Sequence, residues 1–325
     1  MQHISPATFL ISSSLLAVSL LFSLSCSRDV DSHVVDFSKT MQVERPGEST
    51  SPKGSSLRVA VGAMISPRET FAYYHRMLDY IGRRLHMEVE LVQRKTYAEV
   101  NELFARGQVD VGFICSGPYA LSKATYGFEP LATPLVHGQP SYQAYLIVNR
   151  ESTIYRLEDL RGRVFAFTDP QSNTGKLVPT YWVTQLDEQP ETFFARTIYT
   201  YSHDNAIIAV SKELVDGAAV DSLIWEYYNH KRPELTSRTR IIRKSTPYGI
   251  PPLVCSSSLP AQLKGRIRQV LFAMHGDPEG QTILSQLMID RFVPVREEWY
   301  ETIRDMKKKL ASPGNRLDAT SKTQE

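Results

Sequence analysis

The chain has 325 residues, of which 42% are hydrophobic and 22% are charged, and its formal net charge is +2. This composition suits a soluble globular protein with room for about two domains of roughly 150 residues each. The near-neutral charge argues against nucleic acid as a partner, because proteins that bind it usually carry a strong basic excess.

The three cysteines, Cys26, Cys115 and Cys255, are far apart and show no Cys-x-x-Cys spacing. They form neither a disulfide framework nor a recognisable metal site, and we expect no metal and no cofactor. Cys115 and Cys255 each follow an apolar run. They either form one bridge or lie in the core as small buried hydrophobes.

Residues 1–25 have the pattern of a signal peptide. Phe9–Leu24 is apolar and serine-rich. It is too short for a membrane-spanning helix, which needs about 20 strongly apolar residues. It ends at Ser25-Cys26, which resembles the lipobox of bacterial lipoproteins, although Ser23 stands where leucine is usual. We predict that Cys26 is lipidated and holds the exported protein on a membrane, in the periplasm or at the cell surface. The alternative is ordinary cleavage of the signal peptide, with Cys26 incidental.

Two segments outside the folded part are expected to lack regular structure. Residues 26–56 contain few large apolar side chains, so they cannot bury enough surface to offset their ordering entropy. We interpret them as a flexible tether. Residues 312–325 are expected to form a disordered tail.

Strands and helices alternate in the first half of the folded part. The expected strands are Leu57–Val61, Val89–Val92 and Val109–Ile114, and the expected helices are Thr70–Leu85 and Tyr97–Arg106. The last strand is almost continuously apolar, which is typical of a parallel sheet buried on both faces. This alternation predicts an α/β lobe.

The same alternation restarts in the second half. The expected strands are 164–167, 198–200, 217–220 and 239–243, and the expected helices are 174–186, 205–212 and 222–228. Extended runs at Tyr142–Val148 and Pro252–Cys255 flank this second series, and three more helices follow, at 261–274, 280–288 and 297–310.

Two α/β lobes joined by two extended crossings are the plan of a periplasmic binding protein of the type II kind. We assign 57–148 and 245–311 to lobe one and 149–244 to lobe two, with the crossings near Val148 and Tyr248. Lobes of this kind close on a ligand by hinge bending. The ligand cleft is expected between them, at the carboxyl ends of strands.

Two strand-to-helix junctions of lobe two are rich in hydrogen-bond donors. Ser172, Asn173 and Thr174 follow the strand 164–167, and His203 follows the strand 198–200. Side-chain donors and the free N–H groups of a helix start together favour an anion. The alternative for Ser172, Asn173 and Thr174 is a plain N-cap. Lys176, beside them, is interpreted as a solvated helix residue.

These junctions resemble motifs of the phosphate/phosphite/phosphonate-binding proteins of ABC transporters. The family's Asp-Pro-x-Ser-Thr-Ser-Gly and Leu-Val-Pro stand here as Asp169–Gly175 and Leu177–Pro179. Its later motif, a histidine, then Ala-Val, then an aspartate-containing strand, matches His203, Ala209-Val210 and Asp216–Ala218. The resemblance covers Leu57 to Leu310.

The resemblance implies a carrier without catalytic activity that captures a small phosphorus oxyanion and delivers it to an ABC-transporter permease. It places ligand contacts on Tyr97, Tyr142, Ser172, Asn173, Thr174 and His203, with Asn173 in place of the usual threonine. Ser116 could supply one more donor from lobe one, where it follows the strand 109–114. A plain turn or cap is the alternative for Ser116. We expect a monomer.

One departure from the family bears on the ligand. Relatives that take aminoalkylphosphonates hold the amine with carboxylates, and those positions fall near Leu223 and Pro251, where this chain has no acid. The missing acids favour phosphate, phosphite or a simple alkylphosphonate as the ligand. Asp221 either partly replaces a missing acid or accepts a hydrogen bond from a protonated oxyanion.

Two other functions use the same residues. The motifs of common hydrolases, metalloproteases, phosphate loops and dinucleotide sites are missing from the sequence. Cys115 with His203 as nucleophile and base would be an enzyme alternative, with the two residues contributed by different lobes. The sensing subunit of a membrane receptor or histidine kinase would need the same pocket as a transport protein.

Overall fold

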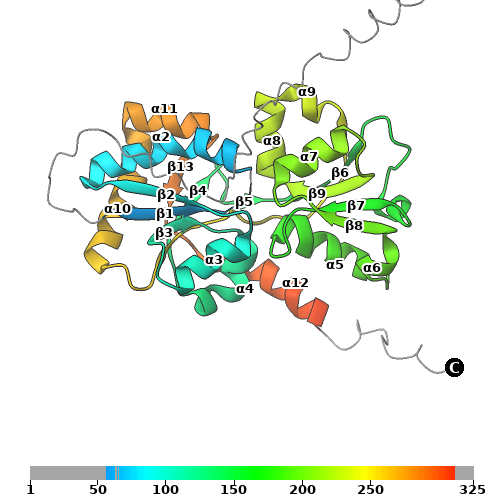
Figure 1. Ribbon diagram of the computed structural model, residues 1–325, viewed down its shortest axis with the longest axis horizontal. Helices are drawn as coiled ribbons and strands as arrows, with labels where there is room; N and C mark the ends of the chain where they lie inside the picture. Colours follow the sequence, from blue (N-terminus) through cyan, green and yellow to red (C-terminus); the bar gives the residue numbers. More distant parts are fainter. Residues whose placement is uncertain (1–55, 63, 65, 312–325) are drawn as a thin grey trace, which may run out of the picture. The chain divides into compact units, whose positions relative to one another are not determined.

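The computed structural model describes residues 56–311, except residues 63 and 65. The predicted signal peptide, the lipidation at Cys26, almost all of the tether and the tail lie outside the described residues. The described residues belong to one compact unit, which holds a six-stranded sheet, a five-stranded sheet and a two-stranded sheet (Figure 1).

The first sheet has six strands in the order β13-β4-β12-β3-β1-β2. Their bounds are β1 Leu57–Val61, β2 Val89–Gln93, β3 Val111–Phe113, β4 Phe128–Leu135, β12 Leu253–Ser256 and β13 Arg291–Val293. β1 pairs in parallel with β2 and β3, and β12 pairs antiparallel with β3 and β4.

Helices cover both faces of this sheet (Figure 1). One face carries α2 Pro67–Leu85, α10 Ala261–Ala273, the 3₁₀ turn η3 Met274–Gly276 and α11 Pro278–Gln286. The other face carries α3 Tyr97–Ala105 and α4 Ser116–Tyr126.

The second sheet has five strands in the order β10-β6-β9-β7-β8. Their bounds are β6 Ala144–Asn149, β7 Val164–Phe167, β8 Arg196–Tyr199, β9 Gly217–Asp221 and β10 Thr239–Lys244. One face carries α7 His203–Ser211, α8 Ser222–Lys231 and α9 Pro233–Thr236. The other carries the π-helical turn η2 Asn173–Leu177, α5 Val178–Thr184 and α6 Pro190–Phe193. The 3₁₀ turn η1 Leu157–Leu160 precedes β7.

Within residues 56–311, three segments join the lobes. β5 Ser141–Tyr142 pairs antiparallel with β11 Tyr248–Gly249. After the 3₁₀ turn η4 Glu297–Tyr300, α12 Glu301–Ala311 contacts α4 of lobe one and α5 of lobe two. The first crossing therefore lies before Ala144 and not near Val148, because the whole of β6 belongs to the second sheet. The return crossing is at β11.

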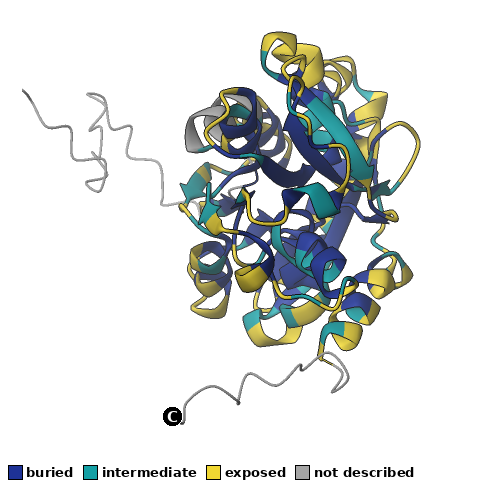
Figure 2. Cartoon of the chain, turned by 90° about the vertical axis from the view of Figure 1, so that its right-hand side faces the viewer, coloured by how far each residue is buried: buried dark blue, intermediate teal, exposed yellow. Residues whose placement is uncertain are grey.

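The core follows the alternation of side chains along each strand. In β6, Tyr145 and Ile147 pack on the α7–α8 side, whereas Leu146 and Val148 pack on the other side. In β7, Phe165 also lies on that other side. Buried segments therefore concentrate in the sheets, and exposed residues on the outer faces of the helices (Figure 2).

The sequence pattern does not predict strand β4, because the strand contains Pro130 and Pro134. Proline cannot donate a ladder hydrogen bond and usually argues against an inner strand. Here β4 lies between β12 and β13, and the register shifts at Leu253 and Val254, opposite Pro130. This local irregularity accommodates the proline.

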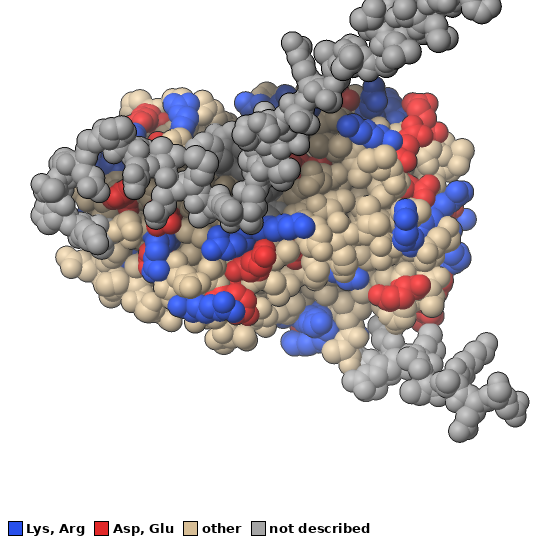
Figure 3. Space-filling model, in the orientation of Figure 1, with Lys and Arg blue, Asp and Glu red and all other residues tan. Residues whose placement is uncertain are grey.

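Charged side chains of both signs are scattered over the visible face in Figure 3, in keeping with the near-neutral sequence. Within the part of the chain that the structure describes, no helix is both long and apolar enough to cross a membrane.

Candidate functional site

The motif that follows β7 folds into a tight turn over the end of the strand. Ser172 Oγ accepts a hydrogen bond from the Gly175 N–H at 3.0 Å, and Gly175 O accepts one from the Thr168 N–H at 3.2 Å. A Cβ on Gly175 would lie 1.8 Å from Thr168 Oγ1, so only glycine fits here. The N-cap interpretation is thus correct for Ser172. The side chains of Asn173 and Thr174 do not take part in this capping hydrogen bond.

Asn173, Tyr142 and Ser116 meet in one buried network drawn from three different elements. Asn173 Nδ2 donates to Tyr142 Oη at 3.2 Å, and Tyr142 Oη also shares a hydrogen bond with Ser116 Oγ. All three residues are at most 3% exposed. Asn173 Oδ1 has no hydrogen-bond partner among the described residues. The network brings the two lobes and the hinge strand together.

Tyr97 supplies a buried hydroxyl from lobe one. Its backbone N–H donates to Asp169 Oδ2 at 3.0 Å, which fixes the start of α3 against lobe two. Its Oη is buried and has no partner among residues that the structure describes. Burial raises the Tyr97 pKa well above its usual value, with Cys115, Asp169, Asp221 and Tyr142 adding to the effect. The hydroxyl therefore stays protonated and remains a donor.

His203 is held as a neutral donor. Its Nδ1 accepts the backbone N–H of Asp221 at 3.0 Å, so the proton of the neutral ring resides on Nε2. Burial lowers the pKa of His203 to about 3. The imidazole is therefore uncharged at neutral pH, and its Nε2 carries the proton that can be donated.

Asp221 lies at the junction of β9 and α8. Its Oδ1 accepts the N–H groups of Leu223 at 2.8 Å and Ile224 at 3.4 Å, which caps α8. Burial raises the pKa of Asp221 to about 7, against those two backbone hydrogen bonds, which lower it. Near neutral pH the carboxyl group is partly protonated, so it can donate or accept a hydrogen bond.

Two interpretations from the sequence need correction or completion at this point. Lys176 is not a solvated helix residue: its Nζ lies 3.8 Å from the centre of the Phe167 ring, and desolvation lowers its pKa. Phe167 and Lys176 lie on opposite sides of the turn, so no short-range sequence pattern predicts their contact. Cys115 and Cys255 are both free and buried, so they do not form a bridge.

The lobes meet through polar contacts beside the donors. Besides the Tyr97–Asp169 bond, Asn101 Nδ2 donates to Gln171 Oε1 at 2.6 Å, and the His203 N–H donates to Met64 O at 2.9 Å. These bonds close the lobes on each other and bury the predicted site residues almost completely.

The structure therefore brings together most of the residues predicted to bind the ligand. Tyr97, Tyr142, Asn173, Ser116, His203 and Asp221 form what we call the donor cluster. Ser172 supports it as a cap, and Thr174 is 1% exposed beside it. Among the described residues, no group of three or more histidine, cysteine, aspartate or glutamate side chains could hold a metal ion.

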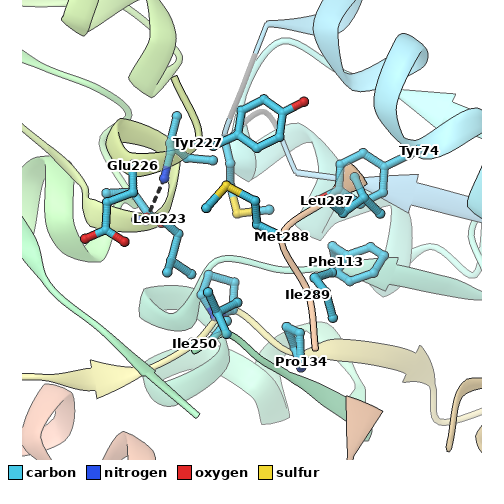
Figure 4. Close-up of a pocket in the computed structure, with 15 residues that line it drawn as sticks. Tyr74, Phe113, Pro134, Leu223, Glu226, Tyr227, Ile250, Leu287, Met288 and Ile289 are labelled. Carbon is cyan, nitrogen blue, oxygen red and sulfur yellow. Dashed lines mark hydrogen bonds between the residues drawn. The ribbon is translucent and has the colours of Figure 1, made fainter. Parts of the chain in front are cut away.

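Sequence reasoning missed a second part of the cleft, which we call the apolar chamber. This cavity of about 100 Å³ is bounded by Met64, Tyr74 and Phe113 of lobe one, by Asp221 and Leu223 of lobe two, and by Ile250 near the hinge (Figure 4). No sequence pattern connects these positions, because they come from separate elements. Only Leu223 and Pro251, which line the chamber and are apolar where an amine ligand would need an acid, gave a hint.

A two-lobed α/β fold with buried hydrogen-bond donors between its lobes is the architecture of solute-binding proteins. The solved structures agree with this fold. A binding-protein component of an ABC phosphonate transporter from Pseudomonas aeruginosa matches 82% of this chain and 90% of its own, with a TM-score of 0.77 and 23% identity. PhnD1 of Prochlorococcus marinus, solved with methylphosphonate, matches 79% of this chain and 98% of its own, with a TM-score of 0.71 and 18% identity.

The chain belongs to the family described as "ABC transporter, phosphonate, periplasmic substrate-binding protein", which it matches over residues 59–300. The phosphonates-binding periplasmic protein of Escherichia coli is 26% identical over 216 residues, which are 65% of this chain and 63% of that protein. The match thus spans a little under two thirds of this relative's length. The family is one of transporter binding proteins and not of enzymes.

Proposed function

We propose that this protein captures a small phosphorus oxyanion in the donor cluster and delivers it to an ABC-transporter permease for uptake. Family membership supports a periplasmic substrate-binding protein. Relatives are named for phosphonates, for phosphate import and, as a probable assignment, for phosphite binding. The oxyanion itself is proposed from the geometry of the donor cluster.

The observation that carries the proposal is the Tyr97 hydroxyl, which is buried without a partner among the described residues. An unpaired buried polar group costs about 1–3 kcal/mol. A bound oxygen acceptor would remove that cost. The Nε2–H of His203 is a second donor whose proton is fixed by the Asp221 backbone bond.

The number of donors suits a carrier. A hydrogen bond to a charged group contributes about 1.5–3 kcal/mol, and a micromolar complex needs about 8 kcal/mol. Four or five bonds from the donor cluster are therefore enough. None of the donors is a cation, and Tyr97 and His203 are neutral, so the anion is held by hydrogen bonds and not by an opposite charge, which suits a protein that must release its cargo.

The proposal is tested by a thermal-shift screen of phosphate, phosphite and methylphosphonate, with sulfate as an oxyanion control, followed by calorimetry of the best ligand. A ligand at 100 times its Kd should stabilise the fold by about 2.7 kcal/mol. If no phosphorus oxyanion raises the melting temperature, the proposed function is wrong.

The electrostatics of Cys115 and His203 argue against the enzyme alternative. Burial raises the pKa of the Cys115 thiol to about 12, so the nucleophilic thiolate is scarce at neutral pH. His203, with a pKa lowered to about 3, is a poor base, and its Nδ1 already accepts the Asp221 N–H. A cleft that holds neutral donors supports binding better than turnover.

For localisation we propose a lipid anchor on Cys26, in addition to the periplasmic location of the family. The apolar run Phe9–Leu24 directly before Ser25-Cys26 supports it. Mass spectrometry of the mature protein should show a diacylated or triacylated N-terminal cysteine. In a Cys26→Ser variant the protein should leave the membrane fraction, and an unmodified Cys26 in the native chain would contradict the anchor.

Transport and sensing need the same pocket, and the family match favours transport. Deletion of the gene should abolish uptake of the radiolabelled ligand into cells, whereas a purely sensing subunit would leave uptake intact once the permease is expressed from another promoter.

A further inference from the structure

The apolar chamber adjoins the donor cluster. Asp221 lines the chamber, and its backbone N–H donates to His203. Met64, on the opposite wall, accepts the His203 N–H through its carbonyl oxygen. Phe113 lines the chamber three residues before Ser116 of the donor cluster. A ligand held by the cluster would therefore have the chamber next to it.

The chamber is apolar on both sides of the cleft. Thirteen of its fifteen lining residues are apolar or aromatic, and the other two are Asp221 and Glu226. Figure 4 shows side chains such as Leu223 and Ile250 facing Phe113, Met288 and Ile289 across the space. Inorganic phosphate would leave this surface without a complementary group.

Neither acid makes the chamber a site for an ammonium group. The Glu226 carboxylate points away from the labelled apolar side chains (Figure 4). It accepts the Tyr145 hydroxyl at 2.6 Å and lies 3.8 Å from His137 Nε2. Asp221 already uses Oδ1 to cap α8, and its buried carboxyl is partly protonated near neutral pH.

We infer that the apolar chamber receives the uncharged organic substituent of an alkylphosphonate, so that the preferred ligand carries a carbon chain and no amine. This inference rests on the proposed function, because the phosphonate group must occupy the donor cluster. The volume sets the size: an apolar cavity of about 150 Å³ holds benzene. The chamber of about 100 Å³ thus suits a chain of one to about four carbons.

The test is calorimetry of the exported chain with phosphite and with methyl-, ethyl- and propylphosphonate. Each added carbon that enters the chamber should tighten binding by up to about fourfold, the equivalent of about 0.8 kcal/mol per buried methylene. The decisive comparison is between propylphosphonate and 2-aminoethylphosphonate, which differ only in a terminal methyl or ammonium group. Propylphosphonate should bind at least about tenfold more tightly, because its methyl group matches the apolar walls, whereas the ammonium would lose water and meet only the Asp221 carboxyl, which already caps α8.

Variants at Leu223 locate the effect in the chamber. Leu223→Asp should reverse the order of the propyl and aminoethyl ligands. Leu214→Asp makes the same change on a leucine of lobe two that is 66% exposed, and it should leave the order unchanged. If Leu223→Asp does not fold, Leu223→Phe fills the chamber and should weaken propylphosphonate selectively, with phosphite binding retained.

The outcomes separate this inference from the proposed function. If no phosphorus compound binds, the proposed function has failed. If phosphite or phosphate binds as tightly as propylphosphonate, or if 2-aminoethylphosphonate equals or exceeds it, the oxyanion site stands and the chamber inference is overturned.

Discussion

The donor cluster and the apolar chamber are neighbours in one cleft, yet they are built by opposite means. The cluster is a set of polar side chains whose directions are fixed by hydrogen bonds, such as the Asp221 N–H on His203 and the Asn173 amide on Tyr142. The chamber is shaped by packing alone. The comparison teaches that such a cleft can recognise a head group by direction and its substituent by volume, since hydrogen bonds are directional and apolar burial is not.

Reversing the polarity of the cluster should have the largest effect. Asn173→Asp keeps the shape, removes the Nδ2 donor and places an acid beside the ligand. Loss of a charge-assisted bond together with repulsion at about 4 Å should weaken methylphosphonate by about 1000-fold or more. Asn229→Asp, on the exposed end of α8, is the matched control. An affinity within tenfold of the native value in Asn173→Asp would remove Asn173 from the site.

Tyr97→Phe should separate binding from folding. Loss of one bond to a charged ligand should weaken binding by about 10- to 100-fold. The ligand-free protein should be unchanged or more stable, by up to about 1 kcal/mol, because an unpaired buried hydroxyl is removed. Calorimetry and urea unfolding measure the two effects.

The control for Tyr97→Phe is Tyr119→Phe, which removes a hydroxyl that donates to Glu297 at 2.6 Å outside the cleft. It should lower stability and leave affinity unchanged. If Tyr97→Phe destabilises the ligand-free protein and spares affinity, the hydroxyl has a structural role only.

A contact that exists only between closed lobes should have a smaller effect. Asn101→Ala removes the bond to Gln171 Oε1, at 2.6 Å, without touching the donor cluster. A neutral hydrogen bond contributes about 0.5–1.5 kcal/mol, so affinity should fall by about 2- to 12-fold. Small-angle scattering should show a larger radius of gyration for the ligand-free variant, and no change in either quantity would argue against a role of this bond in closure.

The smallest effect should be a pH dependence that arises from Asp221. Its pKa is raised to about 7 by burial, so the carboxyl is mostly neutral below pH 7 and charged above it. A charged Asp221 repels an anion, so affinity should fall several-fold between pH 6 and pH 8 beyond the ligand's own titration. His203, with a pKa lowered to about 3, does not titrate in this window.

Asp221→Asn isolates the contribution of the Asp221 charge to the pH dependence of affinity. The amide oxygen can still cap α8, and the ligand titrates identically in both proteins. The difference between native and variant affinities should grow as the pH rises through about 7. A constant difference would show that Asp221 does not change its charge near the ligand.

Much of the fold was predictable because strand and helix periods are local properties. Leu57–Val61 and Val164–Phe167 are strands with the predicted bounds. The helix predicted from Thr174 begins instead with a π-helical turn at Asn173–Leu177, in which Gly175 lies close to Thr168. The prolines of strand β4 argued against a strand in the sequence. The structure tolerates Pro130 because the pairing of β4 with β12 is irregular at that position.

The sequence by itself determined the class of fold, the two donor-rich junctions and the residue types that an oxyanion needs. Only the tertiary structure decided which donors remain unpaired, where the first crossing lies and which side chains enclose the chamber. The physical reason is distance along the chain. Tyr97 meets Asp169 and Leu223 faces Phe113 through contacts between elements about 70 to 110 residues apart, and such contacts leave no periodic signal in the sequence.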